Sequence, residues 1–453
     1  MQTPSPVAAV ILAAGKGTRM KSDLHKVLHP IAGRPMLLHL IDAVSALEPA
    51  RTVVVTGAGR EQVEAAVAPV GAATALQAEQ LGTGHAVLQA KAALADFDGD
   101  VLVLYGDVPL VRPETMRRML EALHEDGTPS AVVLGFRPAD PAAYGRIVAG
   151  SDGRIAKMVE FKDATPEERA VDLCNSGLMA VRAADLWRLL EQVGNDNAAG
   201  EYYLPDIVLL AIAEGRWARV IETEADEVAG VNSRAERAMV EEVWQQRRRA
   251  EAMAAGATLI APHTVWFAHD TRIGRDVTIE PNVFFGPGVT IGNKVAIRAF
   301  SHVEGATVGE GATVGPFARL RPGAVLAPES HVGNFVELKN ATLGAGAKAN
   351  HLTYLGDASI GAGANIGAGT ITCNYDGFFK HRTSIGQGAF VGSNSALVAP
   401  VTIGDGAIVA AGSVVTRDVQ GDALVLVRPE SVIKPGWAAR FRAHMQAKKA
   451  EKK

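Results

Sequence analysis

The chain has 453 residues, of which 48% are hydrophobic, 21% are charged and 47 are glycine, and its formal net charge is -4. Because a single domain usually has about 150 residues, this length predicts two or three domains and excludes a lone small module, while the near balance of charge argues against capture by nucleic acid or an anionic membrane. Only two distant cysteines, Cys174 and Cys373, and no apolar run of eighteen residues predict a cytoplasmic protein without a disulfide framework or a membrane span.

The first 232 residues alternate short apolar runs with stretches of helical periodicity. Runs of Val, Leu and Ile are typical of strands buried on both faces, and the segments at 36–47 and 114–124 space their apolar residues by about 3.6. This alternation predicts a mostly parallel, doubly wound, Rossmann-like α/β domain over residues 1–232. The clearest strands are expected at 7–15, 51–57, 100–110 and 130–136.

A single long helix is expected between the two halves of the chain, over residues 233–255. This segment is rich in helix formers and contains neither Gly nor Pro. Ser233 is placed to act as its N-cap, and Gly256 is placed to end it. We interpret this helix as a linker.

After Gly256 the sequence changes to a period of six. An apolar residue is often followed by Gly or another small residue, a pattern typical of a parallel β-helix in which each repeat supplies one strand and one turn. We therefore expect one prism of about eight triangular coils in residues 256–453, with a tail from Arg428 that is either a solvated terminus or a basic clamp for a phosphate-bearing ligand. The apolar positions are Ile273, Ile279, Phe285, Ile291, Ile297, Val303, Val308, Val314, Leu320, Leu326, Val332, Leu338, Leu343, Ala349, Leu355, Ile360, Ile366, Thr372, Ile385, Val391, Leu397, Ile403, Val409 and Val415.

The interruptions of this period all fall at multiples of three. Five-residue steps follow the sixth, twelfth and fifteenth members, and a long gap follows the eighteenth. A triangular coil would gather these irregularities at one corner, where a rigid scaffold can carry a binding site. Arg321, Lys339, Asn374 and Tyr375 are expected at this corner, and His351 is expected one face away.

Two segments of the first domain point to a phosphate site. The run Leu12–Met20 contains Gly15 and Gly17 directly after a strand, so its backbone can approach a phosphate while Arg19 and Lys26 neutralise the charge. Asp107 ends another buried strand at the same edge of the sheet, where α/β domains bind ligands. One carboxylate together with ligand phosphates is the usual way to hold Mg²⁺.

These segments closely resemble the sugar-nucleotide pyrophosphorylases, through the motifs L-x-x-G-x-G-T-R-M at 12–20, Q-x-x-Q-L-G-T-G-H-A at 77–86 and Y-G-D-x-P-L at 105–110. With the β-helix included, the resemblance covers residues 8–428 and is to the bifunctional bacterial N-acetylglucosamine-1-phosphate uridylyltransferases and glucosamine-1-phosphate N-acetyltransferases. It implies Mg²⁺ at Asp107 and Asn232. The nucleotide and sugar contacts implied for uridylyl transfer from UTP to N-acetylglucosamine 1-phosphate are Leu12, Ala13, Ala14, Gly15, Arg19, Lys26, Gln77, Gly82, Thr83, Tyr105, Gly106, Asp107, Gly145, Glu160, Asn175 and Asn232.

For the β-helix, the resemblance implies acetyl transfer from acetyl-CoA to glucosamine 1-phosphate. His351 would be the general base that takes a proton from the 2-amino group, since a histidine pKa of about 6.5 suits proton transfer near neutral pH. The prism would be left-handed and would form homotrimers, and the final product would be UDP-N-acetylglucosamine, a precursor of peptidoglycan and lipopolysaccharide. The implied sugar-phosphate contacts are Arg321, Lys339, Tyr354 and Asn365, and the implied acetyl-CoA contacts are Asn374, Tyr375, Ser393, Ala411 and Arg428.

Three other functions compete with this interpretation. A single-activity sugar nucleotidylyltransferase with a regulatory β-helix is disfavoured by His351, Lys339 and the Asn-Tyr pair. A zinc-dependent β-helix hydratase would need three convergent imidazoles, and the histidines of this region lack the expected close spacing. A non-catalytic trimerising scaffold would bind no acetyl-CoA.

Overall fold

The computed structural model describes residues 5–125 and 127–451, which divide after Arg248 into two compact units. The first four residues and the last two lysines of the predicted domains lie outside the described residues. The division falls within helix α8 (Arg234–Ala254), which begins and ends within a residue of the expected linker. None of the helices formed by the described residues is both long and apolar enough to cross a bilayer.

The first unit is built on a twisted sheet with strand order β11-β7-β10-β6-β1-β4-β5. Neighbouring strands are parallel except β10, which runs antiparallel to both β6 and β7, so the sheet is mixed and the predicted α/β class is confirmed. The strands are β1 (Val7–Leu12), β4 (Arg51–Thr56), β5 (Ala73–Leu76), β6 (Asp100–Tyr105), β7 (Ala131–Phe136), β10 (Cys174–Arg182) and β11 (Arg219–Thr223), with a hairpin of β8 (Arg146–Ala149) and β9 (Ile155–Val159) beside β10.

Helices cover both faces of this sheet. Alternate residues of β1 enter separate cores: Val10 packs with residues of α3, α6 and α7, whereas Ile11 packs with residues of α1, α2 and α4. Both side chains are fully buried, which explains why the strand is apolar at every position. The helices are α1 (Met36–Ser45), α2 (Arg60–Val67), α3 (Thr83–Gln89), α4 (Pro113–Leu123), α5 (Pro166–Arg169), α6 (Ala183–Leu190) and α7 (Asp206–Ala213).

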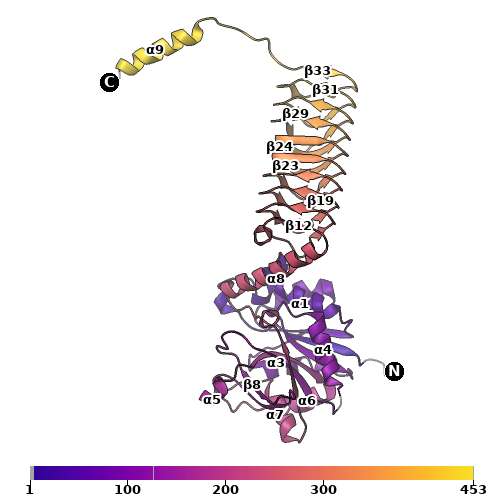
Figure 1. Cartoon of the computed structure of the whole chain (residues 1–453), viewed down its shortest axis with the longest axis vertical. Helices are drawn as coiled ribbons and strands as arrows, with labels where there is room; N and C mark the ends of the chain where they lie inside the picture. The colour runs from indigo at the N-terminus through magenta and orange to yellow at the C-terminus, as the bar shows by residue number, and fades with distance from the viewer. Residues whose placement is uncertain (1–4, 126, 452–453) are drawn as a thin grey trace. The chain divides into compact units, whose positions relative to one another are not determined.

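The second unit is a column of short parallel strands from β12 (Thr258–Leu259) to β33 (Leu424–Val425) (Figure 1). Each strand pairs mainly with the strand three further on, so three strands make one coil, as the period of six predicts and as in a left-handed β-helix. Every predicted inward position is buried except Ile273, which is partly exposed in the strand β13 (Arg272–Ile273). The longest strands, β23 (His331–Leu343) and β24 (Lys348–Ile360), pair along both their lengths.

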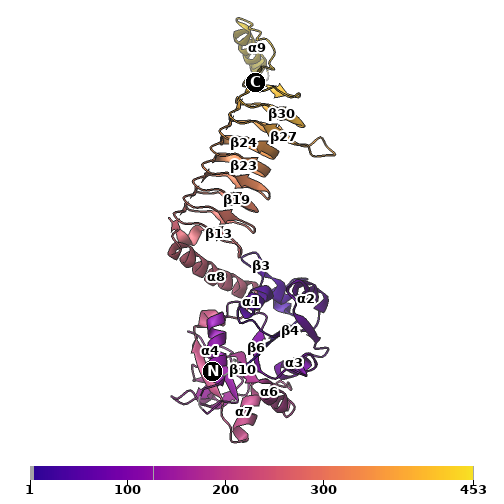
Figure 2. The same ribbon diagram turned by 90° about the vertical axis from the view of Figure 1, so that its right-hand side faces the viewer.

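The strand register confirms that the interruptions share one corner. Val308, Leu326, Leu343, Ile360 and Ile385 lie above one another on a single face, and each shortened or lengthened step ends on this face. The long gap before Ile385 forms a hairpin that projects beside β27 (Thr383–Ile385), as Figure 2 shows. The C-terminal tail contains the helix α9 (Trp437–Glu451), all of whose residues are exposed.

Candidate active sites

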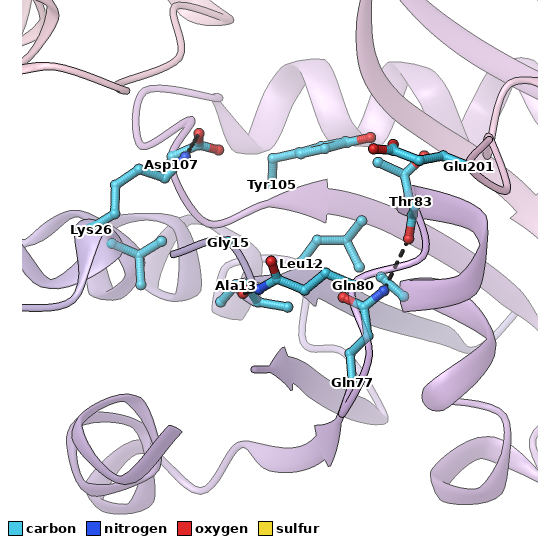
Figure 3. Close-up of a pocket in the computed structure, with 14 residues that line it drawn as sticks. Leu12, Ala13, Gly15, Lys26, Gln77, Gln80, Thr83, Tyr105, Asp107 and Glu201 are labelled. Carbon is cyan, nitrogen blue, oxygen red and sulfur yellow. Dashed lines mark hydrogen bonds and ion pairs between the residues drawn. The ribbon is translucent and has the colours of Figure 1, made fainter. Parts of the chain in front are cut away.

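A pocket of about 300 Å³ opens where β1, β5 and β6 end, in the first unit. Ala13, Ala14 and Gly15, directly after β1, form one wall with their backbone. At Gly15 no heavy atom lies within 4 Å of the position that a Cβ would take. Figure 3 shows Lys26 and Asp107 at one end of this pocket and Thr83 and Glu201 at the other. The predicted site residues that line it are Leu12, Ala13, Ala14, Gly15, Lys26, Gln77, Gly82, Thr83, Tyr105 and Asp107.

Lys26 connects the two predicted metal ligands. Its Nζ lies 2.5 Å from Oδ2 of Asp107 and donates to Oδ1 of Asn232 at 3.1 Å. The backbone holds these oxygens together, because the Val231 N–H donates to the Asp107 carbonyl at 2.9 Å. Asn232 is therefore part of the site although it does not line the pocket itself.

The start of α8 fixes the position of Asn232. Ser233 Oγ accepts from the Glu236 N–H at 3.2 Å, and Oε2 of Glu236 accepts in return from the N–H groups of Ser233 and Asn232, at 2.9 and 2.6 Å. This is a capping box, so the predicted N-cap role of Ser233 is confirmed. Two oxygens, one carboxylate and one amide, converge on a single point, a donor set that suits a hard divalent cation with phosphate and water as its remaining ligands.

The predicted sugar contacts cluster behind Tyr105. A Cβ on Gly145 would lie 3.2 Å from a carboxylate oxygen of Glu160, and the Asn175 N–H donates to the Gly145 carbonyl at 2.9 Å. Burial, with Glu160 and Asp107 nearby, raises the pKa of Tyr105, which also hydrogen-bonds Thr83. The structure thus brings these residues to the Tyr105 side of the pocket without placing them in its lining.

Glu160 is expected to make the stability of the first unit depend on pH. Burial, followed by repulsion from Asp206, Asp163 and Glu201, raises the pKa of its carboxyl group. The charged form is therefore disfavoured in the folded protein, and its cost appears as the pH rises above the unfolded-state pKa of about 4.3. Glu160→Gln should raise the midpoint of thermal unfolding at pH 7.5, and this gain should vanish at pH 4.

The matched control for this prediction is Glu121→Gln, which makes the same change at an exposed position of α4. It should leave the midpoint nearly unchanged at both pH values. A gain from Glu160→Gln of equal size at pH 4 and pH 7.5 would contradict the proposed cost of the buried charge.

Four lining residues were not among the predicted site residues: the apolar Val27 and Ala86 and the polar Gln80 and Glu201. Gln80 Nε2 donates to the Ala14 carbonyl at 2.5 Å and so shapes the turn after β1. Gln80 could have been identified from the Q-x-x-Q motif at 77–80, of which it is the last residue. Glu201 lies more than a hundred residues after this motif in the sequence. Gly106 lies behind the pocket, where its N–H donates to the Leu12 carbonyl. Arg19 lies outside the lining and is exposed on the 3₁₀ turn Thr18–Met20.

Gly82 is required by the backbone at the start of α3. Its φ is +116°, and a Cβ there would lie 2.6 Å from the Tyr202 carbonyl oxygen. Gly82→Ala should therefore cost about 1–3 kcal/mol of backbone strain and lower the first calorimetric unfolding midpoint. Gly194→Ala is the control, since a Cβ there would meet no atom within 4 Å; equal effects of the two substitutions would contradict this explanation.

In the second unit, cations gather at the irregular corner. Arg321 Nη1 donates to Oε1 of Glu337 at 2.8 Å. The cation of Lys380, and then that of Arg321, lowers the pKa of Lys339, so three positive groups lie close together. Lys380 was missed because it belongs to the hairpin in the gap, where the period of six gives no position. Such a cluster suits an anion such as a sugar phosphate.

The predicted residues Asn374 and Tyr375 also lie at this corner. Asn374 Nδ2 donates to Asp357 at 2.5 Å, and Asn340 donates to the same carboxylate at 2.6 Å. Tyr375 belongs to the hairpin, where it forms an isolated bridge with Lys380 and remains mostly exposed. The predicted Asn374 and Tyr375 are thus beside the cations, as the interruptions of the period indicated.

His351 lies at the neighbouring corner, where it is exposed in β24 opposite Asn334. One face of the prism carries the stacked positions Ala349, Ile366, Val391, Val409 and Val425. The residues that follow each of these positions therefore lie above one another at one corner. The predicted acetyl-CoA contacts Ser393, Ala411 and Arg428 follow these positions and lie along the His351 corner.

Tyr354 lies between the two corners. It projects from the face that carries the inward residues Leu338 and Leu355, with Glu337 directly below it in register. Asn365 projects from the neighbouring face that carries Ala349 and Ile366, and Lys348 is its partner in the coil below. One face of the prism therefore has the predicted base at one edge and the cations at the other edge. Among the described residues, no three His, Cys, Asp or Glu side chains converge as a metal site.

Comparisons with known proteins agree with this division. Residues 9–164 match the MobA-like NTP transferase domain, residues 270–305 match the bacterial transferase hexapeptide family, and residues 382–417 match the hexapeptide repeat of succinyl-transferase. Over 100% of both chains, the sequence is 71% identical to the bifunctional protein GlmU of Rhizorhabdus wittichii. It is 68% identical to the bifunctional protein GlmU of Novosphingobium aromaticivorans over 99% of both chains, and 59% identical to that of Zymomonas mobilis over 99% of this chain and 100% of the relative.

Proposed function

The chain belongs to the GlmU family of bifunctional transferases, and from this membership we infer that it catalyses two successive steps of UDP-N-acetylglucosamine synthesis. The acetyl group of acetyl-CoA passes to glucosamine 1-phosphate, and N-acetylglucosamine 1-phosphate then takes a uridylyl group from UTP with release of pyrophosphate. The observation that carries this inference is that two separate constellations, around Asp107 and around His351, lie in two separately packed units.

For uridylyl transfer, we propose that the turn after β1 holds the nucleotide and that the Tyr105 side of the pocket holds the sugar. The sugar phosphate attacks the α-phosphorus of UTP in line with the departing pyrophosphate, so the residues act mainly by alignment and by stabilising negative charge. Lys26 and Arg19 supply positive charge. Asp107 and Asn232 would hold a divalent metal, taken to be Mg²⁺, which when bound neutralises phosphate oxygens.

For acetyl transfer, we propose that His351 is the general base. Its exposed imidazole can accept a proton from the protonated 2-amino group of the sugar, and the lone pair set free then attacks the thioester carbon of acetyl-CoA. The imidazolium returns this proton to the sulfur, so CoA leaves as the thiol, and the nitrogen loses its remaining extra proton to water as the amide forms. Arg321 and Lys339 bind the sugar phosphate, and Tyr354 and Asn365 orient the sugar. The acetyl-CoA contacts are Asn374, Tyr375, Ser393, Ala411 and Arg428.

The same membership supports a proposal for the assembly and the location. Hexapeptide repeats support self-association, and we propose a homotrimer in the cytoplasm, where both sugar substrates and both cosubstrates are found. Light scattering of the purified protein should give a mass three times that of the chain. A monomer or dimer at micromolar concentration would overturn the trimer while leaving the two activities untouched.

The function is tested with one reaction containing glucosamine 1-phosphate, acetyl-CoA, UTP and Mg²⁺, in which free CoA and pyrophosphate are followed separately. We expect CoA to appear first and pyrophosphate to follow after a lag, because the second step consumes the product of the first. Pyrophosphate release from added N-acetylglucosamine 1-phosphate, without any CoA release from glucosamine 1-phosphate, would support the alternative of a single nucleotidyl transfer activity.

A further inference from the structure

The ammonium group of Lys26 lies at the point where the two proposed metal ligands converge. We propose that Lys26 is a placeholder cation, which occupies the point between the Asp107 and Asn232 oxygens in the empty enzyme and makes binding of a divalent cation depend on the nucleotide. This proposal rests on the proposed function, since it takes Asp107 and Asn232 as the metal ligands.

The geometry makes one ammonium group the partner of both oxygens. Nζ lies 2.5 Å from the Asp107 carboxylate and 3.1 Å from the Asn232 amide oxygen, and the side chains of Lys26 and Asp107 are only 14% and 15% exposed. Low exposure strengthens this ion pair relative to one in water. A metal ion that bound both oxygens would have to displace the ammonium group.

The ligands themselves do not need Lys26 to stay in place. Asp107 is tied by its carbonyl to the Val231 N–H, and Asn232 is tied to the capping box of Ser233 and Glu236 at the start of α8. Removal of the lysine charge should therefore leave both oxygens where they are. The substitution then tests competition for the oxygens and not their assembly.

Besides Asp107 and Asn232, the protein offers a divalent ion few ligands at this point. In the part of the chain that the structure describes, no group of three or more His, Cys, Asp or Glu side chains is arranged so that it could hold a metal ion. A metal ion without nucleotide would meet one carboxylate that is already neutralised by a lysine, and would gain little Coulomb energy in exchange for its hydration shell.

A bound nucleotide would allow a metal ion to replace Lys26 at the two oxygens. Lys26 lines the same pocket as Gly15 and the backbone after β1, which is the proposed phosphate cradle. A bound triphosphate gives the ammonium group new anionic partners, so the lysine can leave Asp107 and Asn232 to the metal. Because linkage is reciprocal, nucleotide and metal should strengthen each other's binding.

The test measures Mn²⁺ binding to the full-length protein by the electron paramagnetic resonance signal of free Mn²⁺, without nucleotide. We expect Lys26→Gln to bind Mn²⁺ about tenfold more tightly than the wild type, as expected for removal of a competing charge at contact distance. Lys21→Gln is the matched control: it makes the same change at an exposed lysine directly after the 3₁₀ turn of the same loop region, and Lys21 is not the lysine that contacts Asp107 and Asn232, so the affinity should stay unchanged. Lys26→Met repeats the test without a hydrogen-bonding group, and circular dichroism checks the fold of each variant.

Two results would overturn the placeholder role: unchanged or weaker Mn²⁺ binding by folded Lys26→Gln and Lys26→Met, or an equal gain in Lys21→Gln. A second series with UTP present separates this failure from failure of the proposed function. If Asp107→Ala does not weaken Mn²⁺ binding in the presence of UTP, the metal site itself is wrong. If it does weaken binding there, while the lysine variants show no gain without UTP, only the placeholder role is wrong.

Discussion

Replacement of His351 by alanine is expected to reduce acetyl transfer by about a hundredfold to ten-thousandfold, the range found when a general base is removed. The amine of glucosamine 1-phosphate is largely protonated near neutral pH and is a poor nucleophile until the proton is taken. Uridylyl transfer should stay within about twofold of the wild type, because every residue that lines its pocket belongs to the first unit. The measurement is CoA release with acetyl-CoA in excess, beside pyrophosphate release in a separate assay.

His302→Ala provides the control for this prediction. His302 is exposed on the same prism, on the face that also carries Tyr354, but lies several coils below His351 and stacks on Phe284. Its replacement should leave both activities nearly unchanged. If a folded His351→Ala protein kept most of its acetyl transfer, the base would have to be another group.

Replacement of Asp107 by alanine is expected to reduce uridylyl transfer by at least about a hundredfold. The change removes one of the two proposed metal ligands and leaves the Lys26 ammonium without its partner at 2.5 Å. The leaving oxygen of pyrophosphate would then develop negative charge without the stabilisation that a metal held by Asp107 and Asn232 would supply. Acetyl transfer should be unaffected, and both activities are measured as for His351→Ala.

Asp96→Asn is the matched control, because Asp96 is an exposed carboxylate of the same unit that pairs with Arg51 away from the pocket. Surface pairs of this kind contribute little, so its activities should equal those of the wild type. Loss of both activities in a folded Asp107→Ala protein would contradict the assignment of separate sites.

The β-helix could be predicted in unusual detail because its signal is repeated in every coil. The period of six fixes which residues point inward, and the three short steps and one long gap locate the irregular corner where Arg321 and Lys339 lie. Inside the gap the repeat ends, so no position for Lys380 could be predicted, and its place beside Lys339 depends on how the hairpin folds.

In the first unit, the motifs located the phosphate turn and Asp107, since both directly follow apolar strands. The sequence could not show that β10 is antiparallel, because an apolar strand has the same composition in either direction. Glu201 reaches the site through tertiary contacts, so its place depends on the fold. Glu236 closes the capping box with Ser233, three residues before it, a local pattern that the sequence interpretation did not use. The Lys26 bridge between Asp107 and Asn232 joins residues that are 81 and 206 positions apart.

We propose that one chain holds two independent active sites that share a free intermediate. It is tested most directly by mixing the His351→Ala and Asp107→Ala proteins with glucosamine 1-phosphate, acetyl-CoA, UTP and Mg²⁺ and measuring UDP-N-acetylglucosamine. Each variant alone should form almost none, whereas the mixture should form it readily, because the acetylated sugar made by Asp107→Ala is released and used by His351→Ala. A mixture as inactive as either variant alone would contradict the claim.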